Sequence, residues 1–315
     1  MKVLEYNGDL PRAETVATVG NFDGVHKGHD ILVREVVKRA KENNLCSAVI
    51  TFDPHTREIL YPELSQFLLT TFDEKALLLE RLGVDYLFRI PFDKKFSQMS
   101  PEDFVEKILV NRLRATSWVM GEGHSVGKER AGGKKFLRDA MGKYHITIFT
   151  ADLLTREEQV VSSTAIRKCI IDGSITEAVE MLGHPYLISA IRTRGLKIGS
   201  QIGYPTLNFI RPPSQKVIPP PGVYAAELEF DGVVQPGALY FGECPTFAQR
   251  DVHFEFHSLD LTGREPEVGQ TAHIWLYKFI RKDRTFTDPD ELVKGIKKDI
   301  NAITTFFQEE KPTCR

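Results

Sequence analysis

Two histidines, His26 and His29, lie three residues apart at the end of the glycine-rich stretch Gly-Asn-Phe-Asp-Gly-Val-His-Lys-Gly-His over 20–29. Small and β-branched residues over 15–19 precede this stretch, as in a short buried strand. Apolar residues with helical period follow it over 32–40. A helix N-terminus offers unpaired N–H groups and a partial positive charge, which suit a phosphate. Two imidazoles at this point can stabilise charge that develops on a nucleotide α-phosphate during its transfer.

The histidine pair also admits simpler interpretations. The imidazoles could bind zinc, although the sequence offers no matching third ligand at zinc spacing. They could also be ordinary surface residues. The glycines, Asp23 and the strand-to-helix context together favour the phosphate site.

Two further motifs carry polar groups. Thr-Phe-Asp-Pro-His over 51–55 follows a strand-like run at 45–52, although His55 could equally be a polar loop residue.

The second motif, over 162–167, places hydroxyl side chains at an expected helix start and an arginine one turn later. These groups suit a pyrophosphate leaving group. A plain serine or threonine N-cap is the simpler alternative. These residues are Ser162, Ser163, Thr164 and Arg167.

The elements around these motifs alternate between strand and helix. Strand-like runs are expected at 86–91 and 117–120, and helices at 73–82 and 101–113. This alternation predicts a doubly wound parallel sheet. Because ligands bind at the carboxyl ends of parallel strands, the motifs at 20–29 and 51–55 should lie on one edge.

Length and composition constrain the class of protein. At 315 residues, two domains are expected. A net charge of −2 gives no basic field for nucleic acid. The four cysteines are scattered, with no paired framework, and neither a signal peptide nor a membrane span is found. We therefore expect a cytoplasmic protein, a monomer or weak homo-oligomer, whose partners are small molecules and neither nucleic acid nor membrane.

The pattern changes near Pro185, where a helical segment ending at Gly183 gives way to strand-like segments. Strands are expected at 185–191, at 222–230 and 233–240 around the hairpin signal Asp-Gly, at 252–259 and within 270–279. Closely spaced antiparallel strands favour a small barrel. A helix with the N-terminal signature Asp-Pro-Asp-Glu over 288–291 closes the chain, with an expected apolar face of Leu292, Ile296, Ile300, Ile303 and Phe307.

Two features of this half could carry chemistry. The glycines Gly195, Gly199 and Gly203 precede Thr206 and Asn208, which point to one face of a strand and offer hard oxygen ligands to Mg²⁺. Backbone N–H groups of such a glycine loop can bind phosphates, although turns use glycines too.

The second feature is His-Phe-Glu-Phe-His over 253–257. Glu255 faces away from the two phenylalanines and could deprotonate an alcohol beside a metal–phosphate site. Taken alone, a solvent-facing glutamate on an amphipathic strand is the simpler interpretation.

The motifs at 20–29, 51–55 and 162–167, in that order, resemble the adenylyltransferase module of bacterial bifunctional riboflavin kinase/FAD synthetases, which belongs to the HxGH nucleotidyltransferases. The resemblance implies that FMN attacks the α-phosphorus of ATP, giving FAD and pyrophosphate. It implies that His26 and His29 stabilise the transferring phosphate, that Ser162, Ser163 and Arg167 hold the outer phosphates, and that Phe52 contacts the flavin. Further residues of the ATP site are Gly20, Phe22, Asp23, His55 and Thr164.

The second half resembles the riboflavin kinase module of the same enzymes. The matching segments are Gly-Tyr-Pro-Thr-Leu-Asn over 203–208, Gly-Val-Tyr over 222–224, Gly-Glu-Cys-Pro-Thr-Phe over 242–247, 255–260 and Phe-Ile-Arg over 279–281. The resemblance implies a six-stranded antiparallel Greek-key barrel and two domains, 1–184 and 185–315. It implies that Glu255 is the base that acts on the ribityl 5′-hydroxyl. The other implied residues are Thr206 and Asn208 at Mg²⁺, Gly199 and Gly203 at phosphate, and Arg281 at flavin.

The sequence departs from the family at three places. Gly-Glu-Gly-His-Ser-Val-Gly over 121–127 has Gly123 where the family has a carboxylate or amide, and lacks two aromatics. Ser200 and Tyr240 replace a frequent basic residue and a frequent asparagine. The departure at 121–127 motivates one alternative to the bifunctional enzyme, a riboflavin kinase with a weakened or altered N-terminal domain. An alternative of another class is a non-catalytic flavin- or nucleotide-binding regulator.

Overall fold

The computed structural model describes residues 1–121, 139, 141–151, 161–195, 198–242, 253–260 and 264–311. The chain divides into two compact units, Met1–Ser162 and Ser163–Arg315. This division precedes two helices, whereas the boundary expected from the sequence, at 184/185, follows them. That domain boundary stays a prediction.

The first unit is built on a six-stranded parallel sheet, which confirms the expected doubly wound architecture. The chain enters a central position at β2, adds β3 and β4 on one side and then crosses to add β5 and β6 on the other. In such sheets the reversal of direction opens a crevice at the carboxyl ends of the central strands. In spatial order the strands are β1 (Lys2–Glu5), β4 (Tyr86–Ile90), β3 (Cys46–Phe52), β2 (Thr15–Val19), β5 (Ala115–Met120) and β6 (Thr147–Thr150).

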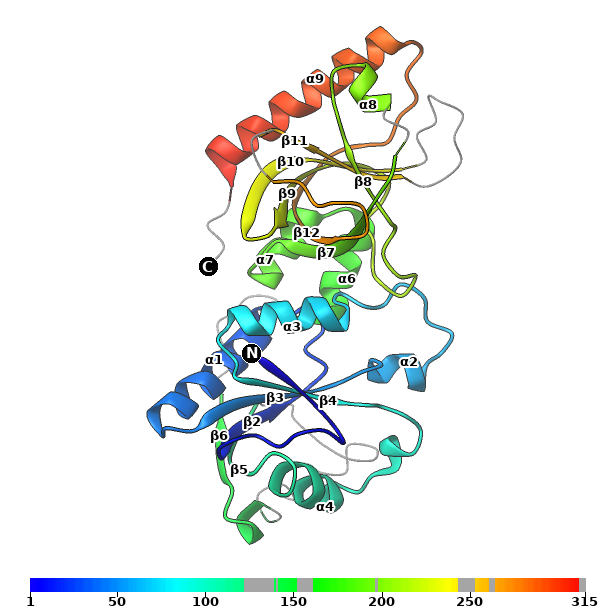
Figure 1. Ribbon diagram of the computed structural model, residues 1–315. Helices are drawn as coiled ribbons and strands as arrows, with labels where there is room; N and C mark the ends of the chain where they lie inside the picture. The colour runs from blue at the N-terminus through cyan, green and yellow to red at the C-terminus, as the bar shows by residue number, and fades with distance from the viewer. Residues whose placement is uncertain are drawn as a thin grey trace. The chain divides into compact units, whose positions relative to one another are not determined.

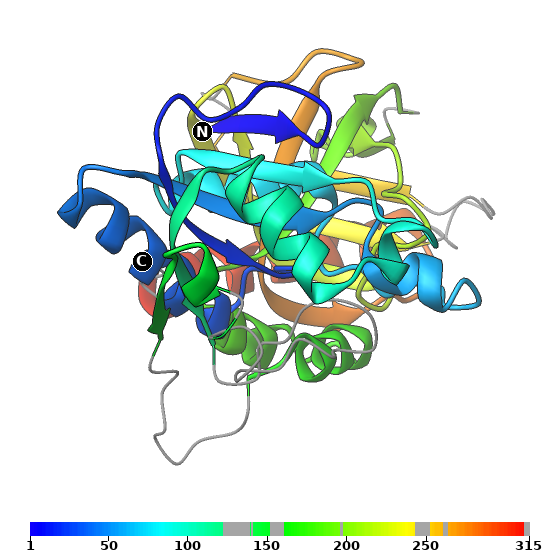
Figure 2. The same cartoon turned by 90° about the horizontal axis from the view of Figure 1, so that it is seen from below.

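Helices cover both faces of this sheet. Figure 1 shows α3 (Phe72–Arg81) and α4 (Pro101–Asp103) on opposite sides of it. The helix at α4 continues as a π-helical segment, Phe104–Val110, which lies across the sheet in Figure 2. Helix α1 (Lys27–Glu42) buries the stripe that its apolar period predicts. The unit also contains the short helices α2 (Thr56–Leu60) and η1 (Phe96–Gln98).

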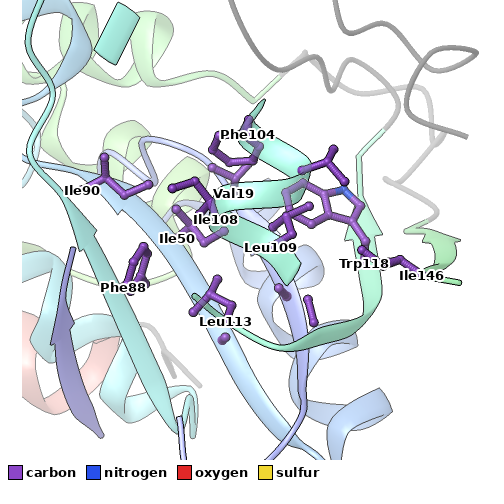
Figure 3. Packing of buried hydrophobic residues seen from close by; sticks show 14 of the residues in the cluster. Val19, Ile50, Phe88, Ile90, Phe104, Ile108, Leu109, Leu113, Trp118 and Ile146 are labelled. Atoms are coloured by element: carbon purple, nitrogen blue, oxygen red, sulfur yellow. The ribbon is translucent and has the colours of Figure 1, made fainter. Parts of the chain in front are cut away.

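The core between the sheet and the helical segment after α4 is shown in Figure 3. Trp118 of β5 is fully buried, and its ring meets that of Phe104 edge to face, with centroids 6.4 Å apart. Side chains from four further strands, including Val19, Ile50 and Phe88, fill the same layer. The layer fixes the positions of the strands whose carboxyl ends carry the motifs.

The second unit begins with α6 (Ser163–Asp172) and α7 (Ile175–Leu182) and continues as a closed six-stranded barrel. Every strand pair in it is antiparallel, as the sequence predicted. Around the barrel the strands are β10 (Val233–Gly242), β11 (His253–Ser258), β8 (Leu207–Phe209), β7 (Tyr186–Thr193), β12 (Thr271–Lys282) and β9 (Gly222–Phe230).

The expected turns and caps are present. Gly183 ends α7 in the left-handed conformation, with φ 81°. Asp231 and Gly232 join β9 to β10 with φ of 53° and 76°, the two positive values that a two-residue hairpin requires. Local turn chemistry therefore fixed these two boundaries.

The C-terminal helix α9 (Pro289–Thr305) begins as predicted, because Asp288 accepts a hydrogen bond from the Glu291 N–H and proline holds the first position. It is followed by a π-helical turn, η5 (Phe306–Glu310). Its buried face includes residues beyond the expected apolar face, none of whose five members is exposed. Ile303 is buried as expected, but Leu292, Ile296, Ile300 and Phe307 are only half-buried, while Gly295, Asp299 and Phe306 are buried.

Candidate functional site

The loop after β2 has an unusual backbone. Phe22, Gly24 and Val25 adopt positive φ values of 46°, 83° and 40°. Such values are costly for a phenylalanine and more so for a β-branched valine. The bare Cα of Gly20 leaves room for the Phe22 ring, which a Cβ there would approach to 3.1 Å. The loop thus turns sharply between the strand and α1.

The two histidines that follow this loop lie together. His26 is the N-cap residue of α1, and His29 lies in its first turn. Their imidazole rings stack with centroids 3.7 Å apart and 18° between the planes. The Phe22 ring meets His29 edge to face at 5.2 Å. His26 is buried, so the pair is a fixed unit at the N-terminus of the helix.

Asp23, predicted to contact phosphate, has protein partners. Its Oδ1 accepts hydrogen bonds from the N–H groups of Leu69 and Thr70, at 2.9 and 3.0 Å. The Thr70 hydroxyl in turn accepts from the Gly24 N–H at 3.0 Å. The loop that carries the histidines is therefore clamped to the segment before α3.

The motif at 51–55 lies at the end of β3, which is hydrogen-bonded to β2, so the two predicted motifs share one edge of the sheet. His55 is buried and caps α2, because its Nδ1 accepts from the Arg57 N–H at 3.0 Å. Phe52, predicted to contact flavin, is half-buried, and its ring lies 5.4 Å from that of Phe92.

Lys75 is a charged residue of this edge that sequence reasoning missed. It is 3% exposed, and its Nζ donates to the Thr51 hydroxyl at 3.0 Å. Burial lowers the pKa of Lys75 to about 8, while the nearby carboxylates of Asp23 and Asp53 oppose that shift. The only sequence signal is its position on the stripe of α3 that also buries Leu78 and Leu79.

The third predicted phosphate motif begins at Ser162, the last residue of the first unit, and continues into α6 of the second unit. Ser163 begins the helix, as expected, and Arg167 is buried. Ser162 and Ser163 are half-buried and Thr164 is exposed. Of the divergent segment 121–127, only Gly121 is among the described residues.

The barrel brings Thr206, Asn208 and Glu255 together. The Thr206 hydroxyl donates to Glu255 Oε2 at 2.8 Å. Asn208 lies directly opposite Glu255 in the β8–β11 ladder, so the two side chains share a face. Phe254 and Phe256 are buried on the other face, as predicted. The side chain of His253 is outside the described residues.

Glycines shape the segment that enters this cluster. A Cβ at Gly195 would lie 2.2 to 2.6 Å from the side-chain atoms of Asn208, so only glycine leaves room for the Asn208 amide in this position. A Cβ at Gly199 would lie 2.2 Å from the carbonyl oxygen of Tyr204. The segment contains a short helix, α8 (Ile198–Gln201), and Gly203 follows it with φ 85°.

Two further residues singled out in the sequence lie in the same unit. Tyr240 is the β10 partner of Glu255, and its hydroxyl donates to Asp283 at 3.1 Å. Arg281, predicted to contact flavin, makes a bidentate ion pair with Asp299 of α9 at 2.8 to 3.0 Å. The motif residues 243–247 lie outside the described part of the chain.

Among the described residues, no group of three or more histidine, cysteine, aspartate or glutamate side chains is arranged to hold a metal ion. Within the same residues, no helix has the length and apolar character needed to span a membrane. Cys46 and Cys169 are free thiols.

Comparison with known proteins covers nearly the whole chain. The family model described as FAD synthetase matches residues 10–165, and the one described as riboflavin kinase matches residues 182–307. A bifunctional riboflavin kinase/FMN adenylyltransferase of Escherichia coli K12 is 33% identical over 307 residues, which is 96% of each chain. One of the same description from Listeria monocytogenes is 34% identical and covers 93% of this chain and 92% of its own.

Among solved structures, a crystal structure described as a macrolide-efflux protein from Streptococcus pneumoniae superposes with a TM-score of 0.79 at 25% sequence identity. The superposition covers 96% of this chain and 98% of that chain.

Proposed function

The chain belongs to the family of bifunctional riboflavin kinase/FMN adenylyltransferases, and we propose that it catalyses both steps that this name describes. The barrel phosphorylates riboflavin to FMN with one ATP. The N-terminal part then adenylylates FMN to FAD with a second ATP and releases pyrophosphate. The observation that carries the kinase assignment is the hydrogen bond between Thr206 and Glu255 beside Asn208.

In the kinase step, Glu255 is the base. A carboxylate on a rigid strand can take the proton of the ribityl 5′-hydroxyl as that oxygen attacks the γ-phosphorus of ATP. The new bond joins the 5′-oxygen to phosphorus, the bond to the β-phosphate oxygen breaks, and ADP leaves. Positioning and charge neutralisation supply most of the rate in such transfers. We assign phosphate binding to the N–H groups around Gly199 and Gly203.

The donor set fits Mg²⁺. The hydroxyl of Thr206 and the amide oxygen of Asn208 are hard ligands, and Gly195, which has no Cβ, leaves room for the Asn208 amide. Thr206 and Asn208 would hold the ion together with the phosphates of ATP. The ion would supply positive charge to the phosphate oxygens during transfer.

In the adenylyl transfer, His26 and His29 stabilise the α-phosphate. A phosphate oxygen of FMN attacks the α-phosphorus, the bond to the β-phosphate bridge breaks, and pyrophosphate leaves. The observation that carries this assignment is the stacked imidazole pair at the N-terminus of α1, where N–H groups and two ring donors converge.

The remaining assignments rest on the sequence motifs. We assign Ser162, Ser163 and Arg167 to the outer phosphates, Phe52 and Arg281 to flavin, and 1–184 and 185–315 to the two functional domains. The ATP site further includes Gly20, Phe22, Asp23, His55 and Thr164. We place the protein in the cytoplasm as a monomer or weak homo-oligomer that binds no nucleic acid, because its thiols lack a disulfide framework and its net charge is near zero.

One assay tests the proposal: incubation with riboflavin, ATP and Mg²⁺, followed by separation of the flavins. FMN and FAD together support it. FMN that never becomes FAD supports a kinase with an altered N-terminal domain, which the departures at 121–127 favour. Binding of flavin without any product supports the regulator and contradicts both enzymatic functions.

A further inference from the structure

A chain of hydrogen bonds joins α3 to the loop that carries the histidines. The Lys75 ammonium donates to the Thr51 hydroxyl at 3.0 Å, and that hydroxyl donates to the backbone carbonyl of Asn21 at 3.2 Å. Lys75 and Thr51 are both buried. The three groups belong to α3, β3 and the loop after β2, so the chain crosses three segments that are distant in the sequence.

The loop needs such support because its own backbone does not favour its shape. Phe22 and Val25 hold positive φ values immediately before His26. Each conformation of this kind costs about 1–3 kcal/mol of free energy, so it persists only where several surrounding contacts hold the backbone in place. The Asp23 clamp holds one side of the loop, and the chain from Lys75 through Thr51 holds the other.

We propose that Lys75 is a positioning residue for adenylyl transfer, which fixes the stacked His26 and His29 by holding the loop through Thr51. Lys75 is buried and reaches Thr51 rather than the helix N-terminus. Lys75 therefore acts through the loop, and the two histidines contact the phosphate. The inference rests on the proposed adenylyl transfer.

Charge around Lys75 explains why a lysine occupies this buried position. Asp23 and Asp53 are the carboxylates that interact with it, and Arg89 of β4 pairs with Asp53. Arg89 offsets the charge of Asp53, and the buried Lys75 ammonium offsets that of Asp23, which would otherwise repel a polyanionic nucleotide.

The test compares Thr51→Val with Thr51→Ser in the full-length chain. Valine preserves shape and removes the hydroxyl, whereas serine keeps it. A misplacement of about 1 Å can lower a rate by ~10²-fold. Thr51→Val and Lys75→Met should therefore lower kcat for FAD formation by at least about tenfold. The KM values for ATP and FMN should each change by less than about threefold. Thr51→Ser should stay within about threefold of wild type.

Riboflavin phosphorylation in the same samples controls for folding and concentration and should be unchanged. If Lys75→Met does not fold, the Thr51 pair decides. Equal kcat values for Thr51→Val and Thr51→Ser overturn the inference, as does a raised KM for ATP with unchanged kcat, which would place Lys75 in nucleotide binding. A wild-type chain that forms no FAD overturns the adenylyl transfer, and the inference falls with it.

Discussion

The Thr206 hydroxyl donates a hydrogen bond to the Glu255 carboxylate at 2.8 Å, although 49 residues separate them in the sequence. The contact holds the carboxylate at the strand position opposite Asn208. A hydrogen bond of this kind fixes the orientation of the carboxylate, which in the proposed kinase step takes the proton of a substrate hydroxyl. The kinase assignment therefore makes a prediction that depends on proton transfer and not on shape.

Glu255→Gln should abolish FMN formation and leave FAD formation from added FMN unchanged. Glutamine keeps an oxygen that can accept from Thr206 but cannot take a proton, so we expect kcat to fall by about 10²–10⁴-fold. Chromatography of the flavins measures both reactions in one preparation. Loss of both activities would mean that Glu255 is structural.

His29→Ala should do the converse. Removing a preorganised donor to the developing phosphate charge should cost about 10²–10³-fold in kcat for FAD formation and leave riboflavin phosphorylation intact. Lys38→Ala, an exposed position further along α1, is the matched control and should change neither rate. Unchanged FAD synthesis in the histidine variant would remove His29 from the mechanism.

Gly195→Ala should impair the kinase selectively. The added Cβ would lie within 2.2 to 2.6 Å of the Asn208 side chain, which must then move from its place beside Glu255. We expect riboflavin phosphorylation to fall by about 10²-fold. FAD formation from FMN, measured in parallel, should stay at the wild-type rate. Full kinase activity would show that Asn208 can act from another position.

Variants of the ion pair between Arg281 and Asp299 distinguish a structural role of Arg281 from a role in flavin binding. Asp299→Ala should destabilise the second unit by about 2–4 kcal/mol, because it leaves a partly buried guanidinium without its carboxylate. Replacing both residues with Met and Leu should recover most of that loss. Urea unfolding of a Trp118→Phe background, which leaves Trp275 as reporter, measures both. If Arg281 also contacts flavin, the double variant should be stable and yet bind riboflavin weakly.

Lys75 should give the first unit a specific pH dependence. Its folded pKa of about 8 lies below the ordinary value of 10.5. Between these values the unfolded chain binds more protons, so the free energy of unfolding should rise with pH, by at most about 3 kcal/mol. Below about pH 8 the burial cost of the ammonium is fully present. Urea unfolding of a Trp275→Phe background reports on Trp118, and Lys75→Met should lack the rise.

Local patterns allowed much of the fold to be predicted. The strands at 15–19 and 222–230 and the turn at Asp231 and Gly232 depend on residues adjacent in the sequence, and they were predicted correctly. The edge strands β1 and β6 were missed because they are short and lack a clear alternation of apolar and polar residues. The predicted apolar face of α9 did not include Asp299, which is buried because it pairs with Arg281.

The placement of residues within one contiguous motif could be predicted from the sequence, whereas contacts between distant residues could not. The sequence predicted that His26 and His29 lie together at the start of a helix, but the stacking of their rings depends on the extended backbone of His26 and was not predicted. Lys75 escaped notice because its partner Thr51 lies 24 residues away and a lysine in a helix ordinarily faces solvent. Asp23 was expected to face phosphate, and its bonds to Leu69 and Thr70 could not be read from the motif.

The two sheets differ in how they guard against self-association. The barrel is closed, so its strands present no unpaired ladder to another molecule. In the part of the chain that the structure describes, the parallel sheet ends at β1 and β6, and each of them pairs with one neighbouring strand. On β1, Lys2 pairs with Asp9 and Glu5 pairs with Arg89. Charged side chains on an edge strand discourage the addition of a strand from another molecule. We therefore expect aggregation on heating to begin at the other edge, β6, whose residues Thr147–Thr150 carry no charge, so that the first unit limits how long the whole protein keeps its activities.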